Sequence, residues 1–173
     1  MDAAEFIGRY RDVGRFLALC AQCTNFNQMW CCPSFDFDAE SLTNGFNIVN
    51  VFGTTIEFDA EILEHGKSPR SAQVIADEAV GEVLKTLLAQ MFSLEAEVPG
   101  SRSFTFRCTL CPQGCARSSG NPCRHPDKMR YSLEAVGFDV TAISHDLLGI
   151  DLEWSSDGSL PPRITLVTAV FRP

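Results

Sequence analysis

The sequence predicts an α+β fold, in which a long helix packs on a small mixed sheet of three to four strands that carries cysteine-rich loops. Three observations predict it. Residues 69–92 have the clearest helical periodicity, residues 46–52 and 164–171 are rich in β-branched side chains, and eight cysteines fall in two segments. No linker separates these segments, so residues 1–173 are expected to form a single domain.

The N-terminal segment, residues 2–19, is expected to form a helix. Asp2 and Glu5 have the spacing of a capping box, with Asp in place of Ser or Thr. The apolar residues that recur at helical spacing are Phe6, Ile7, Tyr10, Val13, Phe16 and Leu17. This helix would end directly before the first cysteine, Cys20. Residues 24–43 are then expected to form a loop, and the strand predicted over 46–52 follows.

The long helix begins after Ser68, its expected N-cap, with Pro69 at the first position. Its apolar face consists of Val74, Ile75, Ala79, Val80, Val83, Leu84, Leu87, Leu88, Met91 and Phe92. Pro99 and Gly100 mark a turn. Residues 103–107 alternate as in a strand, which would run directly into the second cysteine-rich segment.

That segment, residues 108–126, is predicted to be a loop because it is rich in Pro and Gly. Two short helices are expected next, over 127–136 and 140–148, and the glycine that follows each helix can end it. Residues 150–172 are predicted to form a hairpin around a Ser-Asp-Gly turn, with 164–171 as its second strand.

The charge and the N-terminus exclude several classes of partner and location. With a net charge of −8 and a pI of about 4.8, the chain has no electrostatic footprint for nucleic acid or for an anionic membrane surface. Its acidic start, followed by charged residues from Arg9 to Arg15, does not match a secretory signal. No apolar run approaches the ~18 residues of a membrane span. A cytoplasmic location is therefore expected.

Cysteine is the unusual feature of the composition. The first clump contains Cys20, Cys23, Cys31 and Cys32, and the second contains Cys108, Cys111, Cys115 and Cys123. Disulfides are disfavoured in a reducing compartment, where cysteine-rich segments more often bind metal or take part in catalysis. The clumps therefore indicate metal ligands.

The second clump has the spacing C-x2-C-x3-C-x7-C. A C-x2-C pair in a tight turn can direct two thiolates to one metal or cluster, and Gly114 frees the backbone to fold around them. Four thiolates suffice for tetrahedral zinc or for a 4Fe–4S cluster. The alternative of four thiols without metal is disfavoured, because the segment has too many turns to be part of a core.

The first clump offers a C-x2-C pair followed by Cys32. Cys31 is an unfavourable fourth ligand, because adjacent residues seldom direct both thiolates to one metal. A His, a water or a substrate atom could complete this second site instead. A thiol redox pair, as in thioredoxin-like proteins, is a further alternative, but the pair follows a predicted helix rather than the strand of a βαβ unit.

The motifs occur in the order C-x2-C, W-x-C-P, C-x2-C-x3-C-x7-C-R-x-P and R-x-S-x-E-A-x-G-x-D-V. In this respect the chain resembles the bacterial and archaeal "predicted metal-binding protein" family, of unknown function, from about residue 18 to the last strand. The resemblance implies metal binding through Cys20, Cys23, Cys32, Cys108, Cys111, Cys115 and Cys123. The family pattern does not fix Cys31, and this chain has Ser34 and Tyr131 where the family tends to have proline.

Thiolate ligands suit soft metals, namely zinc or the iron of a cluster. In iron–sulfur loops three or four cysteines are often close together in the sequence, as they are in the second clump. An iron–sulfur cluster of the 4Fe–4S type is therefore favoured over zinc. The expected function is a redox or electron-transfer role with a redox protein as partner. One alternative is a small metalloenzyme that uses the open cluster position of a three-cysteine site. The other is a structural-zinc adaptor that binds another protein.

Other side chains are further candidates near the clumps. His125, two residues after the last cysteine, is a possible ligand and a better one than His145. Arg124 and Arg130 flank the second clump and would either compensate its thiolates or lie in water. Trp30 is expected to shield the first clump, with a place in the core without metal as the alternative.

Two acidic residues follow the second clump, and both are expected to have structural roles. Glu134 and Asp139 are assigned to helix termini rather than to acid–base chemistry. The sequence contains no phosphate loop, no supported Ser-His-Asp set and no dinucleotide fingerprint. It therefore names no reaction and no substrate.

Overall fold

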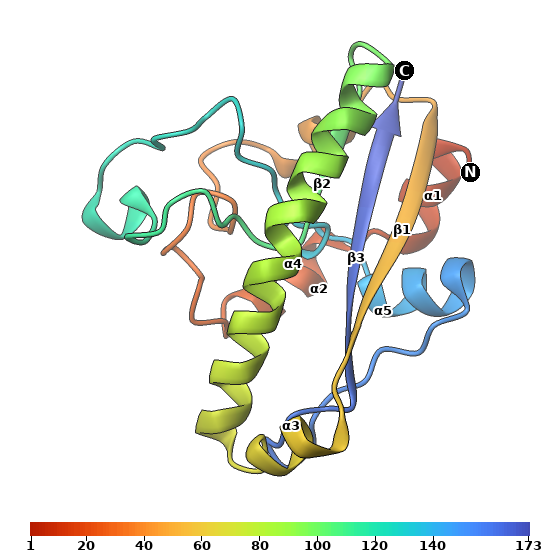
Figure 1. The fold of residues 1–173 in the computed structure, drawn as a ribbon. Helices are drawn as coiled ribbons and strands as arrows, with labels where there is room; N and C mark the ends of the chain where they lie inside the picture. Colours follow the sequence, from red (N-terminus) through yellow and green to blue (C-terminus); the bar gives the residue numbers. More distant parts are fainter.

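The computed structural model describes residues 1–173 and is built on a three-stranded sheet in the order β1-β3-β2 (Figure 1). The central strand is β3 (Arg163–Arg172). β1 (Ile48–Glu57) pairs with it over its full length, whereas β2 (Arg102–Phe104) pairs only near its C-terminal end. The predicted α+β class and the number of strands are confirmed, and both pairings are antiparallel rather than mixed.

Helices cover both faces of the sheet (Figure 1). α4 (Pro69–Glu97) lies across one face, as the sequence predicts, and the short α3 (Ala60–His65) precedes it. α1 (Ala3–Tyr10) and α5 (Val140–Ile143) cover the other face. None of the helices is both long and apolar enough to cross a membrane.

The central strand contributes to two hydrophobic cores, because alternate residues of a strand point to opposite faces of a sheet. Leu166 and Val170 pack with buried residues of α4 in one core. Val167, Ala169 and Phe171 belong to the other core, together with residues of α1 and α5. Burial on both faces explains why this strand is apolar over most of its length.

The sequence predicts one continuous helix over 2–19, but the structure has two separate helices there, so the prediction of a single helix is wrong. α2 (Val13–Cys20) begins after Asp12, whose carboxylate accepts a backbone N–H from the first turn at 2.9 Å. Arg11 is extended and forms an antiparallel bridge with Phe138. A new N-cap and a long-range bridge thus interrupt a pattern that looks continuous in the sequence.

The start of α4 agrees with the sequence. Ser68 caps the helix, Pro69 occupies its first position, and reciprocal hydrogen bonds with Ser71 form a capping box. β1 extends well beyond the predicted strand over 46–52, as far as Glu57. Its long pairing with β3 supplies the hydrogen bonds that hold these extra residues extended.

The sequence predicts a helix over residues 127–136, and this prediction is wrong. They form turns and a short 3₁₀ helix, η3 (Glu134–Val136). The guanidinium group of Arg130 donates to the carbonyls of Asp127 and Met129 at 2.9 and 3.0 Å. Side-chain hydrogen bonds of this kind compete with those of a regular helix.

Residues 150–172 do not form the predicted hairpin, because β3 pairs with the other two strands and residues 150–162 contain no strand. The helix predicted over 140–148 is present. There α5 continues as one π-helical turn, η4 (Ser144–Leu148), and Gly149 follows in the left-handed conformation that ends it.

Candidate metal centre

The two cysteine-rich loops extend to the same side of the fold and lie against each other (Figure 1). The first loop ends in a 3₁₀ helix, η1 (Ala39–Thr43). The backbone N–H of Trp30 in this loop donates to Cys115 Sγ at 3.4 Å, and its indole N–H donates to the Asn121 carbonyl at 3.0 Å. Two clumps that are far apart in the sequence therefore meet in space.

Arg117, in the 3₁₀ helix η2 (Ala116–Ser119), ties the two loops together. Its guanidinium group donates to the Cys32 carbonyl at 2.6 Å and to Asn27 Oδ1 at 3.0 Å. It also lies over the ring of Trp30, 4.9 Å from the centroid. Arg117 is not predicted from the sequence, in which its one signal is a positive charge within the loop of candidate ligands.

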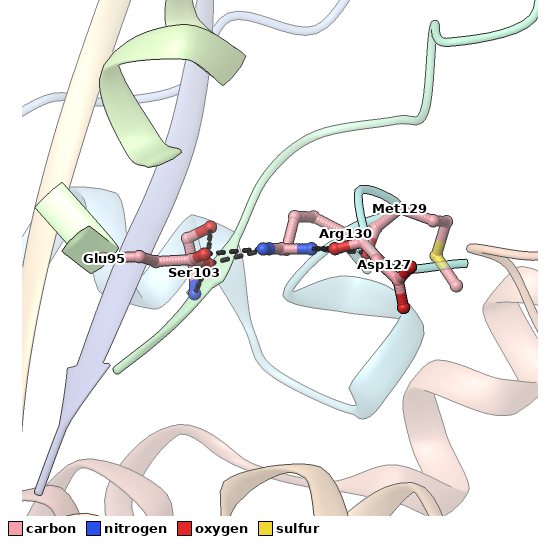
Figure 2. A network of polar contacts seen from close by, with 5 residues as sticks. All are labelled: Glu95, Ser103, Asp127, Met129 and Arg130. Atoms are coloured by element: carbon pink, nitrogen blue, oxygen red, sulfur yellow. Dashed lines mark hydrogen bonds and ion pairs between the residues drawn. The ribbon is translucent and has the colours of Figure 1, made fainter. Parts of the chain in front are cut away.

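Two ion pairs fix the second loop to α4, one at each end. Arg107, before the loop, donates to Asp77 Oδ1 at 2.7 Å. Arg130, after the loop, binds Glu95 through two bonds, Nε to Oε1 at 2.7 Å and Nη2 to Oε2 at 2.5 Å (Figure 2). Ser103 donates to the same carboxylate. Arg130 is therefore engaged with α4 and not with thiolates.

The ion pair of Glu95 is mostly buried. Burial alone would raise the pKa of Glu95, but hydrogen bonds from Arg130 and Ser103 outweigh burial and hold the pKa below its ordinary value. The carboxylate is therefore ionised at neutral pH, and the anchor of the second loop is a charge-assisted one.

A cavity of about 300 Å³, named cavity I, is lined by every cysteine of the second clump. The thiols in its wall are those of Cys31, Cys108, Cys111, Cys115 and Cys123. The apolar side chains in its wall include Met29, Trp30, Leu110, Ala116 and Met129. Trp30 thus faces the second clump, and the prediction that it shields the first clump is wrong.

The backbone of the second loop donates to sulfur and is held in a tight turn. The N–H of His125 donates to Cys123 Sγ at 3.4 Å. Arg124 donates to the carbonyl of Gly114 at 2.9 Å, and this glycine has a φ of 90°, a conformation that L side chains rarely adopt. Burial raises the pKa of Cys108 to about 11, and the neighbouring thiols act in the same direction.

A second cavity, of about 210 Å³ and named cavity II, is lined by the other three cysteines, Cys20, Cys23 and Cys32. Cys20 is the last residue of α2, and the N–H of Cys23 donates to its carbonyl at 2.9 Å. Glu134 also lines this cavity, and its carbonyl oxygen lies 4.0 Å from Cys20 Sγ. Cavity II therefore joins the first clump to η3.

Cys31 and Cys32 belong to different cavities although they are adjacent in the chain. Their sulfur atoms are 3.9 Å apart, yet Cys31 lines cavity I and Cys32 lines cavity II. The hydrogen bond with Cys32 and burial both raise the pKa of Cys31. The two cavities therefore meet at this pair of adjacent cysteines.

Glu134 is the first residue of η3, so it lies at a helix terminus as the sequence predicts, but one of its carboxylate oxygens has no hydrogen-bond partner. The Oε2 atom is buried and makes no hydrogen bond. Burial raises the pKa of Glu134 in spite of a hydrogen bond with Ser132. Asp139, by contrast, caps α5 as predicted, because its Oδ1 atom accepts the N–H of Ala142 at 3.0 Å.

No group of three or more His, Cys, Asp and Glu side chains is close enough together to hold a single metal ion. The thiols instead surround the two cavities. Of the two histidines considered as ligands, His125 lines cavity I. His145 lines neither cavity, and its Nδ1 atom is 2.7 Å from Asp151 Oδ1.

The fold and the two thiol-lined cavities define the class of this molecule, a cysteine-rich α+β protein with candidate metal centres. The chain belongs to the family described as "Predicted metal-binding protein (DUF2284)", whose model matches residues 11–171. The resemblance inferred from the motifs is thereby confirmed. No curated protein and no solved structure matches the chain.

Proposed function

We propose that the protein carries a 4Fe–4S cluster in cavity I and acts in electron transfer. The observation that carries this proposal is that all four thiols of the C-x2-C-x3-C-x7-C clump line one cavity. The four ligands would be Cys108, Cys111, Cys115 and Cys123. The thiols of Cys20, Cys23 and Cys32 are proposed as ligands of a second site in cavity II.

The spacing of the thiols favours a cluster over a single zinc ion. A Zn–S bond is about 2.3 Å long, so four thiolates on one zinc ion are nearly in contact with one another. The thiols of cavity I surround a space of about 300 Å³, and no three of them are close enough to share one ion. Iron and sulfide atoms between the thiolates would fill such a space.

The surroundings of cavity I also suit a redox centre. When bound, a 4Fe–4S cluster supplies one-electron oxidation and reduction. The apolar side chains of Met29 and Leu110 form part of the cavity wall, and the N–H groups of Trp30 and His125 donate to the sulfur atoms of proposed ligands. Both features tune the reduction potential of a cluster. The partner in this proposal is a redox protein, not a nucleic acid or a membrane.

The test is purification without oxygen, followed by measurement of iron, zinc, acid-labile sulfide and the visible spectrum. To isolate cavity I, we would use the variant Cys23→Ser/Cys32→Ser, in which cavity II has lost two thiols. About four irons per chain with matching sulfide, and a broad brown absorption that bleaches on reduction, are expected. Zinc without sulfide would overturn the proposal and favour the structural-zinc adaptor.

A further inference from the structure

A third cavity, of about 540 Å³ and named cavity III, lies beside cavity I. Trp30, Cys123 and Met129 line both cavities, so the two cavities share part of one wall. Cavity III has a volume within the range of about 300–1,000 Å³ that is typical of sites for small organic ligands. The proposed electron-transfer role leaves this cavity unassigned.

Aromatic side chains make up much of the wall of cavity III, namely Trp30, Phe35, Phe37 and Tyr131. The rings of Phe35 and Phe37 stack, with centroids 5.0 Å apart and an angle of 19° between their planes. Tyr131 packs edge-on against Phe35, at 5.2 Å and 85°. Phe35 and Tyr131 also pack against a hydrophobic core, so this group of three rings is fixed to the fold.

Phe37 is the ring of this group that is most open to a ligand. It is 40 % exposed, whereas Phe35 and Tyr131 are half-buried. Planar ring systems stack on aromatic side chains of this kind, and the gain depends little on the hydrogen-bonding pattern of the ligand. The wall of cavity III therefore favours a flat, conjugated molecule.

The charged residues in the wall of cavity III balance each other. Arg117 contributes one positive charge and Asp36 one negative charge. The guanidinium group of Arg117 already donates to the carbonyls of Met29 and Cys32, at 3.0 and 2.6 Å, and lies over the ring of Trp30. Since these donors serve the two loops, the wall favours an uncharged ligand over an anionic one.

We propose that cavity III binds an uncharged, planar aromatic small molecule of the class that includes flavin rings and quinones. Such a molecule would stack on Phe37 and lie against the wall that contains Cys123, a proposed ligand of the cluster. In this place it would exchange one electron with the cluster, so that one of the two is oxidised and the other reduced, with no bond formed or broken. The electron exchange rests on the proposed function, whereas the binding itself does not.

The experiment is equilibrium dialysis of the full-length chain, purified without oxygen, with riboflavin as the probe. One bound riboflavin per chain is expected. Dimethylnaphthoquinone is added as a competitor, and the tighter binder of the two distinguishes a flavin from a quinone as the ligand. Flavin mononucleotide, which carries the same ring and an anionic phosphate, should bind no more tightly than riboflavin.

Substitutions at Phe37 test the place of binding. Phe37→Ala should weaken riboflavin binding by at least about five-fold, the lower end of what a stacked aromatic side chain contributes. Phe37→Tyr keeps the ring and should bind riboflavin as the parent does. The matched control is Trp154→Ala, because Trp154 is 73 % exposed and lines neither cavity I nor cavity III. Circular dichroism and the urea midpoint check that each variant is folded.

Each outcome has a separate meaning. A parent that binds neither riboflavin nor dimethylnaphthoquinone, or a Phe37→Ala variant that binds riboflavin as the parent does, overturns the assignment of cavity III. Tighter binding of flavin mononucleotide than of riboflavin overturns the uncharged class of ligand. Cys111→Ser separates the site from the cluster, since Cys111 lines cavity I alone of the two. If riboflavin binds but the parent contains no iron and sulfide, the proposed function fails and the binding site stands.

Discussion

Cavity I and cavity II differ in how the chain builds them. Cavity I takes four of its five thiols from one stretch of sixteen residues, 108–123, whose ends are fixed to α4 by ion pairs. Cavity II takes its three thiols from residues 20–32, at the end of α2 and in the first loop, and η3 adds Glu134 to its wall. In both cavities the thiols come mainly from one short stretch, but the first loop completes the wall of cavity I, whereas Phe106, Arg107 and η3 complete that of cavity II.

This difference explains what each cavity needs in order to persist. The geometry of cavity I depends on a short loop and its two anchors, Arg107 and Arg130. The geometry of cavity II depends on the packing of α2 against η3 and on the bonds that Arg117 makes across the loops. Three substitutions and one change of pH can therefore test this difference, from the largest expected effect to the smallest.

Cys111→Ser should abolish the centre of cavity I, because a cluster that loses one of four thiolates is no longer fully held. About four irons and the matching sulfide should disappear from the anaerobic protein, as measured by metal and sulfide analysis. Cys23→Ser is the matched control, since it removes a thiol from cavity II instead. Equal iron loss in both variants would show that the cavities do not act separately.

Arg130→Ala should lower the free energy of unfolding by about 3 kcal/mol, because it leaves Glu95 charged and mostly buried without its partner. Urea denaturation of the metal-free protein measures the change. Lys85→Ala, which breaks an exposed pair with Glu82, should cost less than about 1 kcal/mol. A similar small cost for both would mean that the anchor of the second loop does not stabilise the fold.

Arg117→Lys should loosen the contact between the loops while keeping the charge. A lysine cannot reproduce the planar set of donors that reaches Cys32 and Asn27, so a loss of about 1–2 kcal/mol is expected. The same variant should weaken metal retention in both cavities, measured by chelator competition. Loss from one cavity alone would show that Arg117 belongs to that cavity and does not couple the two.

The smallest expected effect is the loss of folding stability at low pH that comes from Glu95. The pKa of Glu95 is lower in the folded chain than the ordinary value of a glutamate, so its contribution to stability is present at pH values above that ordinary pKa. The contribution is lost as pH falls below about 4.5 and through the lowered folded-state pKa. Denaturation series at several pH values should show this loss in the metal-free parent and not in Arg130→Ala. An identical pH dependence in both would assign it to other carboxylates.

The long helix could be predicted because its signals are local, from the cap at Ser68 to its repeating apolar face. The four thiols of cavity I could be predicted for the same reason. The break at Asp12 could not, since it depends on a bridge to Phe138. Nor could the place of Glu134, which reaches cavity II only through the packing of η3 on α2. Local spacing therefore reveals one cavity and only part of the other.

The two hydrophobic cores of the sheet contain no cysteine. Small zinc-dependent domains fold only when they bind the metal, because metal binding supplies the free energy of folding that a hydrophobic core would otherwise supply. Here the apolar interior is complete without any ligand residue, so we expect the newly made chain to fold first and to be loaded afterwards. A cell could then keep a reserve of folded, empty protein and load the proposed metal centre later.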